Sequence, residues 1–143
     1  MKAKPFLIGF LCVVLALIAG SIYLAATTDR ADKAIAAVAA PDGKYKAVRL
    51  TVYNDTPEPF CVDTIGIFLT VYPDSFVASN SGYQVYGAPC AAPGKRDSLP
   101  KMEWLANNKL QITYSPEPGA GKPPRLKERD MSLFVDITYV KVE

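Results

Sequence analysis

The chain has 143 residues, which is the size of one small domain, and half of its residues are hydrophobic. It contains 16 basic and 14 acidic residues, and Lys2 and Lys4 precede a long apolar run, so the remainder is electrically balanced. A nucleic-acid-binding domain needs a clustered basic surface. The composition therefore argues against a nucleic-acid partner.

The chain has no histidine, and its three cysteines are Cys12, Cys61 and Cys90. The commonest general base and the commonest neutral metal ligand are therefore absent. The cysteines also lack the close spacing of a zinc site. We predict a protein that is not an enzyme, with no catalytic residue, no metal and no cofactor. An enzyme that works through carboxylates or lysine stays open as an alternative.

An uncharged segment, residues 6–26, follows the two lysines. A spanning helix needs about 20 apolar residues, whereas the apolar part of a cleaved signal is usually about 7–15 residues long. The length favours a permanent anchor in the lipid bilayer, and the lysines predict a cytoplasmic N-terminus. We predict a single-pass protein of the bacterial inner membrane with a periplasmic C-terminal domain. Small-x-small triplets at 19–21 and 25–27 leave open cleavage and secretion to the periplasm.

Residues 29–40 are rich in alanine and are followed by Pro41. Alanine has the highest helix propensity and proline ends a helix, so this stretch predicts a short helical stalk. A disordered linker is the alternative. The predicted organisation is a cytoplasmic tip and transmembrane helix over 1–28, a stalk or linker over 29–40, and an extracytoplasmic β domain over 41–143.

From Pro41 onward the helical period is lost. Residues 41–44 (PDGK) have the composition of a tight turn, because proline presets φ and glycine accepts a left-handed conformation. The next stretch, 45–53, alternates in polarity and predicts a strand with Val48, Leu50 and Val52 on one face.

More strands follow along the chain. The stretch 64–72 is apolar on both faces, so we expect a strand covered on both sides. Between it and a short strand over 83–87 lies a loop with room for a single helical turn. The predicted remainder is a hairpin over 101–115 that turns at Asn107-Asn108, and a last strand over 131–142. The fold class is mainly β, a small antiparallel sheet or sandwich of about six strands preceded by one transmembrane helix.

Cys61 and Cys90 both belong to the domain placed outside the membrane. If strands 64–72 and 83–87 pair as a hairpin, the two cysteines lie just past its open end. An oxidising compartment then favours a disulfide between them. A redox-active pair is the alternative, but such pairs are usually separated by two residues near the start of a helix.

The proline-rich connection from residue 116 to residue 130 is longer than an ordinary loop, and long loops are often functional. Four basic side chains in it form a candidate partner-binding loop: Lys122, Arg125, Lys127 and Arg129. Acidic residues interleave with them, so a charged partner or lipid headgroups would be the ligands. A plain solvated loop is the alternative.

Part of the sequence resembles a pattern in small uncharacterised bacterial envelope proteins: the stretch PDGKYKAVRL, a later cysteine, and the stretch MEWLANNKLQITYSP. Those proteins carry one N-terminal hydrophobic segment and a β domain with S/A-P-D-G-K-Y and W-x5-L-x-I motifs. The resemblance covers residues 40–116, with Ala40 in place of the usual serine. The same pieces are similar to blades of TolB-type propellers, but a propeller needs several blades and one set is present. The resemblance implies an envelope location and a β fold, and it transfers no site residues.

Taken together, these features predict a membrane-anchored extracytoplasmic binding or structural protein. Its expected partners are the lipid bilayer, through residues 6–26, and another envelope protein. The oligomeric state is not specified by the sequence. An alternative is an immunity or inhibitor protein that neutralises an envelope-acting toxin or hydrolase, since inhibition requires a surface and no chemistry.

Overall fold

The structure is a computed structural model, and it describes residues 13–19, 31–54, 59–91, 95, 98–115 and 122–143. The chain divides into two units, Met1–Arg30 and Ala31–Glu143. In the first unit residues 13–19 are helical, and most of the predicted span 6–26 lies outside the described residues. Among the described residues, no helix has the length and apolar character needed to cross a membrane.

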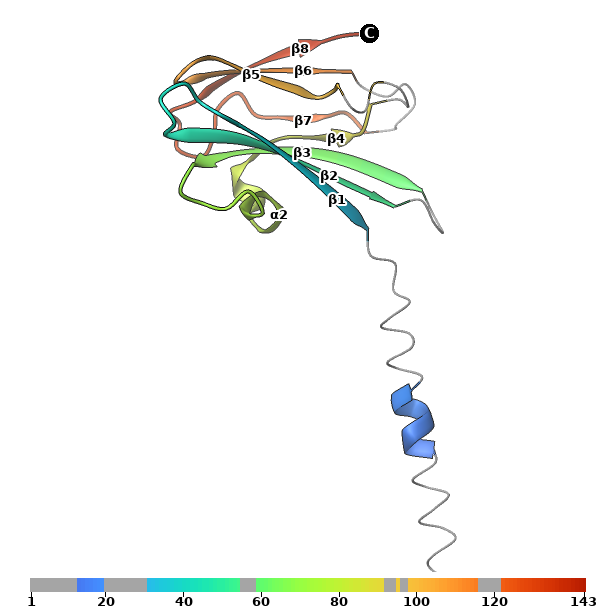
Figure 1. Cartoon of the computed structure of the whole chain (residues 1–143). Helices are drawn as coiled ribbons and strands as arrows, with labels where there is room; N and C mark the ends of the chain where they lie inside the picture. Colours follow the sequence, from blue (N-terminus) through green and yellow to red (C-terminus); the bar gives the residue numbers. More distant parts are fainter. Residues whose placement is uncertain (1–12, 20–30, 55–58, 92–94, 96–97, 116–121) are drawn as a thin grey trace, which may run out of the picture. The chain divides into compact units, whose positions relative to one another are not determined.

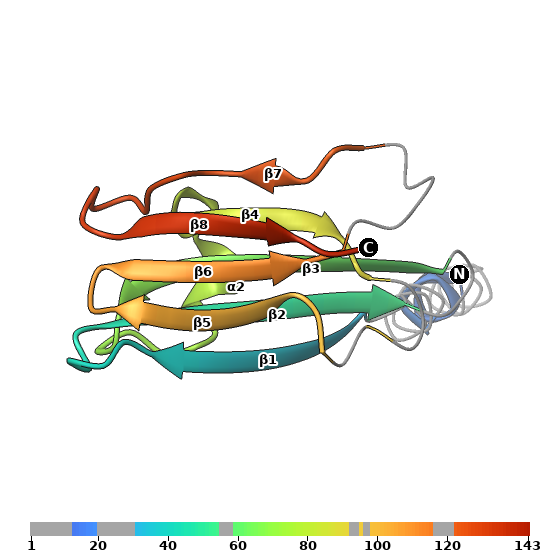
Figure 2. The same ribbon diagram turned by 90° about the horizontal axis from the view of Figure 1, so that it is seen from above.

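The second unit consists of two β-sheets that pack face to face (Figures 1 and 2). One sheet has five strands in the order β1-β2-β3-β4-β7, and the other has three in the order β5-β6-β8. The bounds are β1 Asp32–Ala39, β2 Tyr45–Asn54, β3 Phe60–Leu69, β4 Gln84–Pro89, β5 Lys101–Ala106, β6 Lys109–Tyr114, β7 Arg125–Leu126 and β8 Asp136–Lys141. The predicted mainly-β class is confirmed.

The predicted turn at residues 41–44 joins β1 to β2. Gly43 has φ 69°, and the Lys44 N–H donates to the Asp42 carboxylate at 3.0 Å. Both features are those expected of glycine and aspartate in a tight turn. The turn therefore belongs to a hairpin and does not separate a stalk from the domain.

The stretch predicted as a helical stalk or disordered linker is strand β1. All eight residues Asp32–Ala39 pair antiparallel with β2, from Asp32 opposite Tyr53 to Ala39 opposite Lys46. The prediction was wrong because alanine's helix propensity is a weak preference, and pairing along a whole neighbouring strand overrides it. The β domain consequently begins at Ala31 and not at residue 41.

The last strand also differs from the prediction. It begins at Asp136 and not at residue 131, because Asp130–Ser132 forms a turn and Leu133 has φ 60°. β8 runs parallel to β6, against the expected antiparallel arrangement. The long connection after β6 permits this, since it crosses to the five-stranded sheet, adds the short strand β7 there, and returns. β1 and β7 raise the number of strands in the described residues to eight.

The main core lies between the two sheets. Ile65 and Ile67 of β3 face Leu110 and Ile112 of β6 across this layer, and all four are fully buried. Arg49 is also directed into the layer, where it donates to the Pro100 carbonyl oxygen at 3.2 Å.

A second, smaller core covers the other face of the five-stranded sheet at one end. It contains Val48 and Leu50 of β2, Phe68 of β3 and Val77 of the short helix α2, Phe76–Ser79. The stretch predicted as a strand over 64–72 is β3, which spans Phe60–Leu69, and the prediction that it is covered on both sides is confirmed for this end. Since α2 has four residues, it covers only part of the face.

Gly66 of β3 lies directly beneath α2. A Cβ atom at this position would lie 2.9 Å from Val77 Cγ2, closer than real Cβ contacts. We expect Gly66→Ala to lower the free energy of unfolding by about 1–3 kcal/mol, because α2 must shift from the sheet. Gly87→Ala is the matched control, since its Cβ would meet neighbours only at 3.9 Å. Urea unfolding of both variants gives the measurement, and equal stabilities would contradict the close contact.

Candidate functional site

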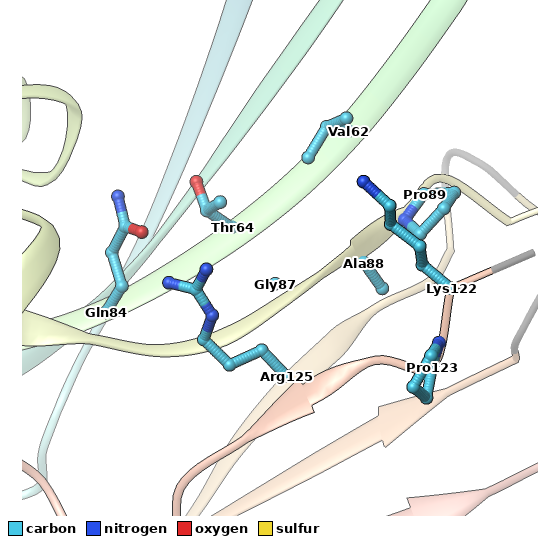
Figure 3. Close-up of a pocket in the computed structure, with 9 residues that line it drawn as sticks. All are labelled: Val62, Thr64, Gln84, Gly87, Ala88, Pro89, Lys122, Pro123 and Arg125. Carbon is cyan, nitrogen blue, oxygen red and sulfur yellow. The ribbon is translucent and has the colours of Figure 1, made fainter.

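The part of the outer face that α2 leaves uncovered contains a groove of about 340 Å³ (Figure 3). Its walls are Val62 and Thr64 of β3, Pro89 of β4, and the segment that leads into β7. Val62 is 39% exposed although it lies on a central strand. The hollow therefore exists because no helix or loop among the described residues covers this end of the sheet.

A glycine forms the floor of the groove. Gly87 of β4 lies in register between Thr64 of β3 and Arg125 of β7. A Cβ atom at residue 87 would contact both neighbours at 3.9 Å, so the absence of a side chain opens the space. Gln84 stands at one end of the groove and donates from its amide to the Val77 carbonyl oxygen at 3.2 Å.

Two cations line the groove. The side chains of Lys122 and Arg125 extend over β4 toward β3 (Figure 3). Neither forms a hydrogen bond or an ion pair with any residue that the structure describes, and none of the described residues that line the groove is acidic. A positively charged hollow with apolar walls suits an anionic group attached to an apolar or extended backbone.

The structure separates the four basic residues of the predicted partner-binding loop. Lys122 and Arg125 share the groove, whereas Lys127 donates from Nζ to the Gly82 carbonyl oxygen at 3.3 Å. Arg129 Nε lies 3.1 Å from an Asp136 carboxylate oxygen. Two of the four therefore line the groove and two are engaged within the domain.

Tyr139 of β8 holds this segment in place. Its hydroxyl lies 2.8 Å from the carbonyl oxygens of Val85 and Lys127, to either of which it can donate, and it accepts the Lys127 N–H at 3.2 Å. Burial raises the pKa of Tyr139 to about 12; the Lys127 N–H bond lowers it in part and nearby Tyr114 raises it further. The hydroxyl thus joins the two sheets at the β4–β8 side and fixes where Arg125 emerges.

A polar group lies beneath the groove, on the inner face. Asp63 of β3 is 2% exposed and accepts a 2.5 Å hydrogen bond from the Thr51 hydroxyl, with Arg49 Nε at 3.9 Å. Burial first, and the Asp63 charge second, raise the pKa of Tyr86 far above its ordinary value. Because these groups are enclosed and satisfied, they support the sheet and do not face a ligand.

The predicted disulfide between Cys61 and Cys90 is present, with the Cα atoms 5.3 Å apart. Val62 opposes Pro89, so the same register places the two cysteines directly opposite each other, one pair beyond the end of β4. The Cys90 N–H also donates to the Cys61 carbonyl oxygen at 3.1 Å. The bond closes a loop with a sequence separation of 29 residues and borders the groove at Val62 and Pro89. In the chain-entropy description it stabilises the domain by about 3–4 kcal/mol.

A smaller cleft of about 210 Å³ lies at the other end of the sheet, lined by Tyr45, Tyr72, Tyr83 and Asp130. Asp130 is 3% exposed, and it accepts hydrogen bonds from the Ser132 N–H and hydroxyl and from the Val135 N–H at 2.8 Å. Its carboxylate is therefore occupied by the turn before β8. Among the described residues, no three acidic or cysteine side chains converge on a metal-sized site.

In comparisons with protein-family models, curated proteins and solved structures, nothing matched this chain. The resemblance to bacterial envelope proteins accordingly stays a prediction. The groove was only partly accessible from the sequence, because Lys122 and Arg125 belong to a recognisable basic stretch while Thr64, Gln84 and Gly87 have no distinguishing signal.

Tyr139→Phe tests the anchoring of the Arg125 segment. At neutral pH the variant should lose about 1–2 kcal/mol of stability, because the partly buried hydroxyl's hydrogen bonds to the Val85 or Lys127 carbonyl oxygen and from the Lys127 N–H are lost. The folded-state pKa of about 12 exceeds the unfolded value of 10.0, so the hydroxyl stabilises fully below pH 10 and the contribution is lost as the pH rises toward 12. The stability difference between the wild type and the variant should therefore shrink over this range in urea unfolding. Tyr72→Phe is the control, and a difference that is constant with pH would contradict the assignment.

Proposed function

We propose that this protein is a membrane-anchored, extracytoplasmic binding module of a bacterial envelope, and that its groove binds an anionic segment of another envelope protein. The observation that carries the binding role is the groove itself, in which Lys122 and Arg125 face solvent without a counter-charge among the described residues. Charged side chains that lie at a concave surface without an ion-pair partner are available to a ligand.

Two features support the location. The 6–26 segment is uncharged and follows two lysines, as expected of an anchor with a cytoplasmic N-terminus. The Cys61–Cys90 disulfide joins β3 to the residue that follows β4, and such bonds persist in oxidising compartments such as the periplasm.

Apolar contacts would complement the charge. The groove also has apolar walls, which are formed by Val62 and Pro89 of the sheet and by Pro123 of the loop. These walls would exclude water from one side of a ligand. An extended acidic peptide fits this combination, because its carboxylates can meet Lys122 and Arg125 while its backbone lies along Gly87. The site needs no nucleophile or general base for this role.

Thiol trapping in intact cells tests the location. With a large maleimide applied during rapid lysis, the full chain should be modified only at Cys12, since the other two cysteines are oxidised outside the cytoplasm. A variant that lacks residues 6–26 should stay in the cytoplasm and keep free thiols at both Cys61 and Cys90. Free thiols at these two cysteines in the full chain would overturn the proposed location.

A titration with hexaglutamate tests the groove, with hexaglutamine as the uncharged comparison. Hexaglutamate should shift the amide NMR signals of Thr64, Gln84 and Arg125, and added salt should weaken the binding. The double variant Lys122→Gln/Arg125→Gln should weaken it by about five- to thirtyfold, the range expected for two partly exposed charge-assisted contacts.

The control for this titration is Lys109→Gln/Lys141→Gln, which removes two charges from exposed positions of the three-stranded sheet. It should change the affinity by less than about twofold, since screened charges outside the groove contribute little. Equal losses in the two double variants would show nonspecific attraction and contradict a groove site. Absence of shifts at the three groove residues would do the same.

A further inference from the structure

The five-stranded sheet ends in a long strand edge without a partner among the described residues. β1 is the terminal strand on this side, and every one of its eight residues is exposed. Its register with β2 is regular and contains no bulge, and the strand contains no proline. Charges occur only at Asp32 and Lys33, so the run 34–39 lacks the usual devices that prevent pairing at an edge.

The hydrogen-bonding groups on this edge can be assigned from the ladder. The Ala40 N–H donates to the Tyr45 carbonyl oxygen, and backbone groups alternate in direction along a strand. The even-numbered residues of β1 therefore face β2. The odd-numbered residues direct their N–H and C=O groups away from the sheet, and these are Lys33, Ile35, Ala37 and Ala39.

We propose that two copies of this chain associate through β1, antiparallel and centred on Ala36, to form one continuous ten-stranded sheet. In this register residues 33–39 of one copy pair with residues 39–33 of the other. All four outward-facing residues of each copy then exchange backbone hydrogen bonds. The two five-stranded sheets become continuous, with the same face outward in both.

The side chains of β1 fit a second copy in this register. On the outer face Ile35 meets Ala37 of the other copy, and on the inner face Val38 meets Ala34 of the other copy. Ile35 and Val38 are 44% and 39% exposed in the single chain, so each large apolar side chain gains a small apolar neighbour. Lys33 meets Ala39 of the other copy, and the two Lys33 side chains lie at opposite ends, so no like charges oppose.

Cysteine cross-linking tests this register in the full chain, in detergent and with Cys12→Ser as background. Ala36→Cys should form a disulfide-linked dimer under mild oxidation, since residue 36 opposes itself in a non-hydrogen-bonded pair with Cα atoms about 4.5 Å apart. Ala34→Cys is the matched control, because the two copies of residue 34 would be about 13 Å apart along the strands, too far for a disulfide.

A proline variant separates pairing from folding. Ala37→Pro removes an N–H that faces away from β2, so the variant should keep its thermal unfolding midpoint within a few degrees while self-association in sedimentation equilibrium weakens by about tenfold or more. Ala36→Pro removes an N–H that faces β2, and should lower the midpoint instead. Monomer at high micromolar concentration, or equal cross-linking at residues 34 and 36, would overturn the proposal; unchanged association of folded Ala37→Pro would also overturn it.

Discussion

The burial of β3 on both faces is the constraint on which the rest of the domain depends. Ile65 and Ile67 enter the layer between the sheets, and Phe68 enters the smaller core under α2. A strand buried on both faces needs neighbours on both edges and a cover on each side. β2 and β4 supply the edges, the three-stranded sheet supplies one cover, and α2 supplies part of the other. The groove lies in the part of that face that the described residues leave uncovered.

The two sides of the sandwich are closed by different means. On the β4 side the chain passes from β7 to Glu128, whose carbonyl oxygen accepts the Ile137 N–H, so residues 125–129 connect both sheets through backbone bonds. On the β1 side one hydrogen bond to β5 is found among the described residues, from Trp104 Nε1 to the Val38 carbonyl oxygen at 2.9 Å. The β4 side, which backbone bonds close, carries Lys122 and Arg125. The β1 side keeps a strand edge that is available for pairing.

The central strands could be predicted from the sequence because their signals are local. Alternation marked β2, apolar residues on both faces marked β3, and the Asn107-Asn108 turn marked the hairpin of β5 and β6. The disulfide could also be predicted, because hairpin pairing brings residues just outside the strands together.

Other elements depend on tertiary contacts that leave little local trace. β1 looks like a helix by composition, and its identity as a strand is set by eight pairings with β2. β7 has two residues, Arg125 and Leu126, and it is a strand only through their pairing with Gly87 and Tyr86 of β4. The parallel direction of β8 follows from where the connection returns. Apart from Lys122 and Arg125, the groove could not be predicted for the same reason, since it needs the register of β3, β4 and β7 and the short length of α2 together.

The groove and the β1 edge lie on one sheet, so pairing through β1 would affect binding at the groove. Antiparallel pairing in the proposed register keeps the outer faces of both copies on the same side, because odd-numbered residues pair with odd-numbered residues. Seven strand spacings would separate the two copies of β4, which is about 34 Å at about 4.8 Å per spacing. Two weak cationic grooves held at this distance on one face would bind a partner with two acidic segments far more tightly than either groove alone, provided that the partner can span them. An exposed charged groove has a modest affinity by itself, so pairing at the opposite edge of the sheet would be the feature that makes such a site effective.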